Sequence, residues 1–342
     1  MDYAYTIFCI IGASVCFISV YFIWQIPGRP WSTLLLITWL FTYNIFSAVD
    51  SIVWEGDDLS GTPDGVGYCD VSARLKTVFP LGVLGCTISL CLFLLEKSNS
   101  TSLRRRKEDP NRVRRNIADV CLGVVMPLLF IIFKFIVEPS RYVIVGVMGC
   151  QGTFDTSWPT IPLYFMWPPL LTLIAFAMIG KTSISDSNAV MLLYHWYIRR
   201  RDPRMSFPVG PNGISEVEFL QLASPLIYVI ANFLPLSLFL LIQFLMDRQD
   251  APPFSWSRIH GSQYNLIYKY AHPNAPWYCW IQILLAISPI FAILARPSVV
   301  VECCVEWLYD HSPIGLQVNL PSWRLVSVRC KERRQASKTG SN

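Results

Sequence analysis

Long apolar stretches alternate with short polar ones along most of the chain. Five stretches carry no charged residue, and each has 19 residues or more: 4–24, 77–95, 159–180, 219–246 and 277–295. A helix needs about 20 apolar residues to cross the hydrocarbon core of a bilayer. Two further stretches carry one charge each, 31–54 with Asp50 and 120–137 with Lys134. The pattern therefore predicts seven transmembrane helices.

We expect an all-α membrane protein, with a seven-transmembrane helix bundle over residues 1–300 and a short cytoplasmic tail over 301–342. The spans are placed at about 4–24, 31–54, 72–96, 118–137, 159–180, 219–246 and 277–296. The first run follows Asp2 rather than a basic residue and is longer than the apolar core of a signal peptide, so we interpret it as a span. Lys134 lies near the end of its span, where a long side chain can reach the interface.

Composition and charge agree with a membrane protein and indicate its orientation. The chain is 53% hydrophobic and 15% charged, whereas soluble domains are about a quarter charged. If the N-terminus lies outside, the inner segments hold 21 Lys and Arg residues and the outer loops hold 4. Basic residues concentrate on the cytoplasmic side, so we expect the N-terminus outside and the C-terminus inside. The net charge of +5 then suits an anionic lipid surface rather than nucleic acid.

The eleven cysteines fall into two groups. Nine lie in spans or on the inner side, where thiols pack in the core or stay reduced. Cys69 and Cys150 lie at the outer face, and two cysteines in an oxidising exterior favour a disulfide between them. Cys303 and Cys304 follow the last span closely, so they are either palmitoylation sites or unmodified interfacial cysteines.

The sequence gives little support to an enzyme. All four histidines lie outside the spans, and the zinc motif HExxH does not occur. We therefore expect no catalytic residues, no metal site and no cofactor. A transporter would need polar coupling sites within the membrane. The candidates, Asp50, Asp70, Arg74 and Lys76, all lie near the outer end of the bundle, and Asp70 and Arg74 are spaced to pair with each other along one helix.

Prolines are frequent in the spans, and each one frees a backbone carbonyl and bends its helix. Pro225 and Pro235 lie ten residues apart in the sixth span. This span is our candidate for a moving switch helix with its hinge at the two prolines. Static kinks are the equal alternative.

Several segments between 68 and 246 resemble one known family. They are YCDVSARL (68–75), RRNIADVCLGVVMPLLFIIFKFIVEPSRYVIVGVMGC (114–150), YFMWPPLL (164–171), YIRRRDPRMSF (197–207) and FLPLSLF (233–239). The chain resembles the fungal a-factor-type mating pheromone receptors, the lipopeptide branch of the fungal class of G-protein-coupled receptors. It departs from the family at Ile144, Val145 and Gly146, where members often have an aromatic or acidic residue. These departures leave room for a paralogue with a different ligand.

The resemblance implies a multi-pass plasma membrane receptor that binds a farnesylated peptide pheromone and signals through a heterotrimeric G protein. We expect ligand contacts at the outer mouth, from Asp70, Arg74, Arg141, Tyr142 and Trp158. We expect G-protein coupling by the inner basic clusters Arg104, Arg105, Arg106, Arg199, Arg200 and Arg201. The lipid bilayer surrounds the receptor, and the formation of a homodimer is left open. The alternative function from another class is a seven-helix small-solute transporter.

Overall fold

The structure is a computed structural model. It describes residues 2–24, 30–55, 59, 61–99, 112–185 and 253–271, with scattered positions between 233 and 246. The described part contains five helices long and apolar enough to cross a membrane. They run over Tyr3–Tyr21, Trp31–Val53, Tyr68–Phe93, Val113–Ile136 and Ile161–Met178. Each overlaps one of the first five expected spans. The expected spans 219–246 and 277–296 lie outside the described residues, apart from the scattered positions.

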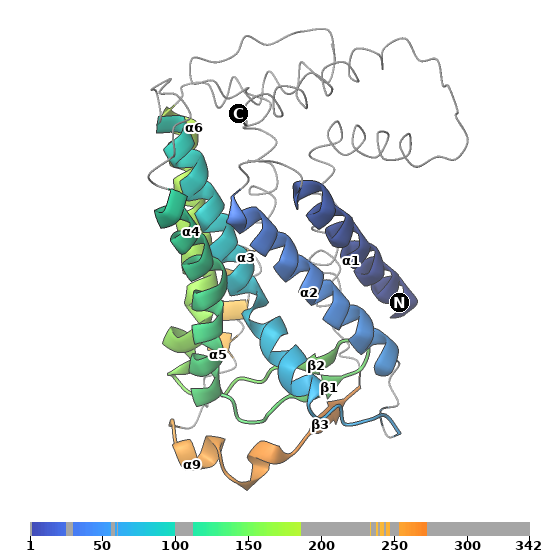
Figure 1. Ribbon diagram of the computed structural model, residues 1–342. Coiled ribbons are helices and arrows are strands. Elements are labelled where there is room, and N and C mark those ends of the chain that lie inside the picture. The colour runs from blue at the N-terminus through green and yellow to red at the C-terminus, as the bar shows by residue number, and fades with distance from the viewer. Residues whose placement is uncertain are drawn as a thin grey trace, which may run out of the picture. The chain divides into compact units, whose positions relative to one another are not determined.

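Helix α3, Tyr68–Asn99, lies in the middle of the described helices (Figure 1). It contacts α2, Trp31–Val53, on one side and the fourth and fifth spans on the other, while α1, Asp2–Trp24, packs against α2. Most of α3 is buried, whereas only a third of the apolar part of α1 is. A helix that is apolar on all sides suits such a central position.

The fourth span is one helical segment built from three parts. They are α4, Arg112–Val120, the π-helical turn η1, Cys121–Val125, and α5, Met126–Ile136. Pro127 follows the π-turn, and a proline ring inside a helix clashes with the carbonyl four residues earlier. That carbonyl belongs to Gly123, and it accepts a hydrogen bond from the Trp39 indole at 2.8 Å. The wider turn and the indole together satisfy the group that the proline displaces.

The fifth span repeats this arrangement. A second π-helical turn, η2 over Ile161–Phe165, precedes α6, Trp167–Ser185. Pro168 and Pro169 follow two residues after the turn, and the carbonyls four residues before them, those of Tyr164 and Phe165, belong to it, so the widened backbone again lies where ring and carbonyl would clash. Prolines within spans were expected to bend their helices, and here the α-helical hydrogen-bond pattern is interrupted by the π-helical turn.

Apolar and aromatic side chains form the core between the helices. Tyr43 of α2 stacks on Phe79 of α3 with ring centroids 4.3 Å apart, and Phe130 of α5 meets Trp167 of α6 edge-on at 5.5 Å. Gly85 allows a close approach of α3 to the fourth span, because a side chain there would meet the carbonyl of Leu122. Such small residues let membrane helices pack tightly.

A buried carboxylate holds the start of α2. Pro30 precedes this helix and offers no side-chain cap. The Asp119 carboxylate of α4 accepts the Ser32 backbone N–H at 3.1 Å and the hydroxyl of Ser89 in α3. A negative charge there satisfies free N–H groups and the helix dipole. Three spans therefore meet at one fully buried carboxylate.

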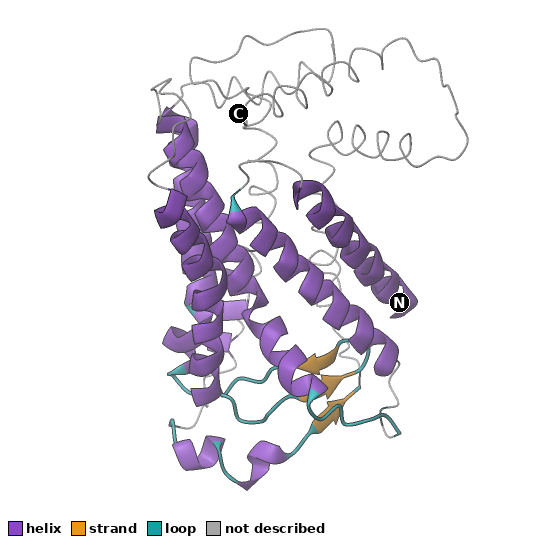
Figure 2. Ribbon diagram, in the orientation of Figure 1, coloured by secondary structure: helices purple, strands orange, loops and turns teal. Residues whose placement is uncertain are grey.

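Strands occur at one end of the helices, which we call the sheet end (Figure 2). Strand β1, Val143–Val145, pairs antiparallel with β2, Gly149–Gln151, and parallel with β3, Tyr268–Tyr270, in the order β2-β1-β3. The first two strands belong to the segment 138–160, called the strap below. The third follows two short turns, α9 over Trp256–Ile259 and η3 over Ser262–Asn265.

Candidate functional site at the sheet end

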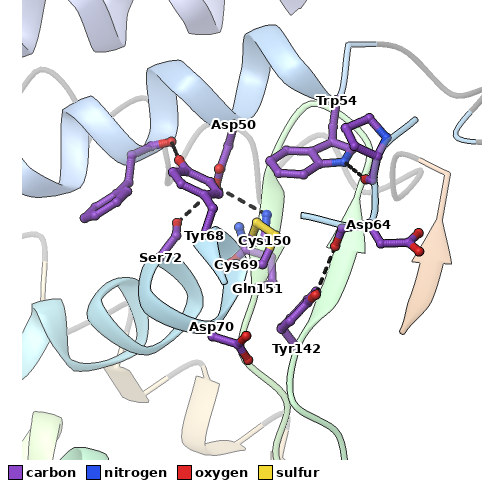
Figure 3. The surroundings of a disulfide bond; sticks show 12 residues. Asp50, Trp54, Asp64, Tyr68, Cys69, Asp70, Ser72, Tyr142, Cys150 and Gln151 are labelled. Atoms are coloured by element: carbon purple, nitrogen blue, oxygen red, sulfur yellow. Dashed lines mark hydrogen bonds between the residues drawn. A yellow bond between two sulfur atoms is a disulfide. The ribbon is translucent and has the colours of Figure 1, made fainter. Parts of the chain in front are cut away.

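The predicted disulfide between Cys69 and Cys150 is confirmed, and both cysteines are fully buried. It joins the first turn of α3 to strand β2 (Figure 3). Eighty-one residues separate the two cysteines in sequence. The strap is therefore covalently attached to the central helix.

Trp54 and Tyr142 pack with the disulfide in a small apolar cluster. The Trp54 indole donates to the carbonyl of Pro63 at 3.0 Å, and its own carbonyl accepts the N–H of Val147 at 2.8 Å. The Tyr142 hydroxyl donates to the carbonyl of Asp64 at 2.9 Å. The end of α2, the 61–67 loop and the strap are thus joined around one centre (Figure 3).

A buried ion pair lies directly under the β1–β2 hairpin. The Lys76 ammonium of α3 pairs with the Asp50 carboxylate of α2, and both side chains are almost completely buried. Lys76 also donates to the carbonyl of Met148 at 3.0 Å, and Asp50 accepts the N–H of Cys150 at 3.2 Å. Each charge therefore has its partner and also binds the hairpin backbone, as a charge inside a membrane requires.

The hairpin turn shows how closely its backbone approaches this pair. Gly149 has φ of +63°, a conformation that suits glycine. A side chain at Gly149 would collide with Asp50. Val147 also has a positive φ, 64°, which is unusual for a β-branched residue. The contacts with Trp54 and the ion pair hold this turn in place.

Asp70 and Arg141, two of the expected ligand residues, bind each other. The Arg141 guanidinium donates two hydrogen bonds to the Asp70 carboxylate, from Nε to Oδ1 at 3.0 Å and from Nη2 to Oδ2 at 2.5 Å. The hydrogen bonds to Asp70 raise the pKa of Arg141. Asp70 also accepts the N–H of Gly67 at 3.1 Å. Its partner lies in the strap, so the alternative pairing with Arg74 one helical turn away is not the one observed.

The other expected ligand residues lie in different surroundings. Tyr142 is fully buried, and burial raises the pKa of its hydroxyl. Trp158, in the strap just before η2, is 59% exposed. Arg74 is half-buried on α3. Their roles toward a ligand stay predictions.

Two ion pairs attach the 253–271 segment to the rest of the sheet end. Arg258 of α9 binds the strap carboxylate of Asp155 through both nitrogens, each at 2.8 Å. Burial of Asp155 disfavours its charge, but hydrogen bonds from Arg258 and Ser157 outweigh burial and lower its pKa. Lys269 of β3 pairs with Asp64 at 2.8 Å. Sequence reasoning missed both pairs, because nothing in the local pattern joins residues about 100 or 200 positions apart.

The expectation for Lys134 is wrong. Its side chain is 1% exposed and pairs with Glu138 at 2.9 Å, inside the protein rather than toward the interface. The ammonium also lies 5.6 Å from the centre of the Phe154 ring. The i,i+4 spacing of Lys134 and Glu138 was a readable signal for this pair.

Some predictions fall outside the described residues. They concern Arg104, Arg105, Arg106, Arg199, Arg200, Arg201, Pro225, Pro235, Cys303 and Cys304. Within the described part, no group of three or more His, Cys, Asp or Glu side chains could hold a metal ion.

Comparison with a solved structure supports the fold, and a family model identifies the family. The chain is similar to squid rhodopsin with a TM-score of 0.56 and 16% identity, over 90% of this chain and 87% of the rhodopsin chain. A likeness at that identity shows the fold alone, and it agrees with the expected seven-helix membrane bundle. The family model "Pheromone A receptor" (STE3) matches residues 4–296. The chain belongs to this family, which is a family of receptors and not of enzymes.

Three curated relatives are fungal pheromone receptors. The "Pheromone a factor receptor" of Saccharomyces cerevisiae is 24% identical over 91% of this chain and 62% of its own length. The "Pheromone M-factor receptor" of Schizosaccharomyces pombe is 24% identical over 64% of this chain and 55% of its own. The "Pheromone B beta 1 receptor" of Schizophyllum commune is 22% identical over 70% and 41%. The matched part thus spans less than two thirds of the length of each relative. The family expected from the sequence is confirmed by the family model.

Proposed function

We propose that the chain is a G-protein-coupled receptor for a farnesylated peptide mating pheromone. It lies in the plasma membrane with its N-terminus and sheet end outside, and it signals through a heterotrimeric G protein. The family match over 4–296 carries the proposal, because that range includes all seven expected spans and the whole strap. The inner segments of this topology hold 21 Lys and Arg residues and the outer loops hold 4. This distribution supports an outer N-terminus and an inner C-terminus.

The sheet end suits recognition of the peptide part of such a ligand. A farnesyl chain gains most of its free energy by entering the bilayer, and lipid tails are about as apolar as a protein groove. Discrimination between ligands then depends on polar contacts with the peptide. We assign these contacts to Arg74 and to the exposed Trp158. The Asp70–Arg141 pair and Tyr142 hold the strap in the position where the peptide meets it.

On the inner side we assign G-protein contact to the basic clusters 104–106 and 199–201, with Pro225 and Pro235 as the hinge of the moving helix. Replacing Arg199, Arg200 and Arg201 by Gln should abolish G-protein activation and leave ligand binding near normal. Nucleotide exchange equal to wild type would reject this assignment. Palmitoylation of Cys303 and Cys304 and the formation of a homodimer stay open alternatives.

The proposal is tested in fungal cells that lack their own pheromone receptors and carry a reporter of the mating pathway. Cells expressing this chain receive a panel of synthetic S-farnesyl peptides and the same peptides without the lipid. We expect a dose-dependent response to at least one farnesyl peptide and none to its unlipidated form. A response only to unlipidated peptides identifies a paralogue with another ligand. Solute flux in proteoliposomes without any signalling response would instead identify the transporter.

A further inference from the structure

The basic residues at the sheet end are almost all neutralised one by one. Five ion pairs each join one basic side chain to one carboxylate: Lys76–Asp50, Lys134–Glu138, Arg141–Asp70, Arg258–Asp155 and Lys269–Asp64. No carboxylate serves two bases among them. These five basic side chains of the described sheet end therefore each have their own carboxylate, both in the buried pairs of Lys76 and Lys134 and in the more exposed pairs of Arg258 and Lys269.

Arg74 is the exception. It lies on α3 between Asp70 and Lys76, is half-buried, and forms no ion pair with any residue that the structure describes. The nearest acid along the helix, Asp70, is occupied by both nitrogens of Arg141. The expected sixth and seventh spans contain no acidic side chain that could pair with Arg74, because 219–246 and 277–295 contain no charged residue.

The surroundings of Arg74 increase the need for a negative partner. The Arg74 guanidinium hydrogen-bonds the hydroxyl of Tyr264 in η3, and its charge acts on Asp70 and Lys134, so it has a neutral partner but no carboxylate among the described residues. Lys134 carries the same sign, and Glu138 pairs with it through one carboxylate oxygen. The strap lies close to Lys134 and Thr77, since a side chain at Gly152 would meet both. The cluster of α3, α5 and the strap thus holds one positive charge in excess.

A carboxylate would add an ionic partner to a guanidinium that is partly withdrawn from water and has only a neutral hydroxyl partner. Arginine presents a planar set of donors that matches a carboxylate through two parallel hydrogen bonds. An unpaired intramembrane charge is a marker of a functional site. The other five bases at the sheet end show that this fold supplies partners where a charge is only structural.

We propose that Arg74 is the anion-binding residue of the ligand site and takes a carboxylate of the peptide. This inference rests on the proposed function and specifies its ligand as an acidic lipopeptide. In this proposal Arg74 contacts the ligand, whereas Asp70 and Arg141 bind each other and position the strap. The carboxylate comes either from an Asp or Glu side chain or from a free C-terminus.

The test uses the full chain and matched synthetic S-farnesyl peptides. One arm compares Asp or Glu with Asn or Gln at each position, and another compares the free C-terminal acid with its methyl ester. Signalling is read in reporter cells, and binding is read as the shift in unfolding temperature of purified receptor. We expect one acidic form to be at least about 10-fold more potent than its neutral partner, the ratio that a charge-assisted hydrogen bond provides. The arm that shows the ratio identifies the source of the carboxylate.

The variants assign the effect to Arg74. Arg74→Gln should respond equally to the acidic and neutral members of the pair, whereas Arg74→Lys should keep part of the preference. Lys269→Gln removes one positive charge from β3 and should keep the full preference, with surface expression measured for all. Equal potency of the two peptides in wild type, or a preserved ratio in Arg74→Gln, overturns the proposal.

The two readouts distinguish the proposals from each other. Acid-selective binding without signalling would reject the proposed receptor function and leave the site in place. Signalling without acid selectivity would reject the site alone. Neither binding nor signalling from any peptide of the panel would overturn both. If Arg74→Gln does not reach the surface, the ratio in Arg74→Lys decides, because an unchanged ratio there contradicts a contact in which the geometry of the guanidinium matters.

Discussion

In the middle of the described helices the spans meet through apolar and aromatic side chains. At the sheet end one disulfide and four ion pairs join separate segments of the chain, and a fifth pair, Lys134–Glu138, lies within one segment. In the first region the lipid tails compete with the protein for the same contacts, so close packing and prolines decide the shape. In the second region each charge selects one partner. A site that reads a peptide needs such fixed polar groups, and a lipid-facing surface does not.

The largest expected effect comes from breaking the buried pair under the hairpin. Asp50→Asn leaves the Lys76 ammonium without its counter-ion, and removing one member of a buried pair costs about 3–5 kcal/mol. We expect loss of surface expression and of thermal stability in nanodiscs. The double variant Asp50→Leu, Lys76→Met should be more stable than either single one. The exposed pair of Asp64 and Lys269 is the matched control, and Asp64→Asn should cost about 1 kcal/mol or less.

That contrast between pairs is easily contradicted. If Asp50→Asn were as stable as Asp64→Asn, the buried pair would not be what holds the hairpin.

The second effect concerns the disulfide. Cys69→Ser or Cys150→Ser should lower the unfolding free energy by about 2–4 kcal/mol, because the crosslink restricts the unfolded chain. The double variant should be no worse than either single one, since both remove the same bond. Thermal unfolding measures the loss, and mass spectrometry of unreduced peptides identifies the bond. Additive losses would mean that the two cysteines stabilise the protein independently.

The third prediction examines the helical middle. Trp39→Phe keeps the apolar packing but removes the donor to the Gly123 carbonyl that Pro127 displaces. A hydrogen bond between membrane helices contributes about 0.6–2 kcal/mol, so we expect a loss of about 1 kcal/mol in the unfolding free energy. Trp31→Phe, at a side chain that is 45% exposed, is the control and should change little. Equal losses in both variants would show that the indole donor has no special role.

The smallest effect is a dependence on pH. The pKa of Asp155 is lowered in the folded state, so its pair with Arg258 contributes stability above the unfolded pKa of about 3.9. That contribution is lost as the pH falls through the lower folded-state value. Because Arg258 is 37% exposed, water and salt screen the pair, and we expect about 1 kcal/mol or less.

The measurement is the difference in unfolding temperature between wild type and Asp155→Asn from pH 7 down to pH 3. A constant difference down to pH 5 and a decrease below pH 4 is the expected curve. A difference that grows as the pH falls would contradict the sign of the shift.

The sequence was sufficient for the five helices that the structure describes as possible spans and insufficient for most pairs at the sheet end. Apolar runs predicted the five described spans, because helix length and bilayer thickness are directly linked. The disulfide was predictable because Cys69 and Cys150 were the only two cysteines placed at the outer face by the sequence. Asp50 and Lys76 were noticed as intramembrane charges, but their shared contact with the hairpin depends on a turn that no local pattern reveals. Arg141 was assigned to the ligand, and its bond to Asp70 became visible only in three dimensions.

The most direct test of the receptor account is G-protein activation by the purified chain. The receptor is reconstituted in nanodiscs with a fungal heterotrimeric G protein, and GDP–GTP exchange is followed with and without the farnesyl peptide that is active in cells. We predict that the farnesyl peptide accelerates exchange and that its unlipidated form does not. Exchange that is unchanged by the active farnesyl peptide would contradict the account.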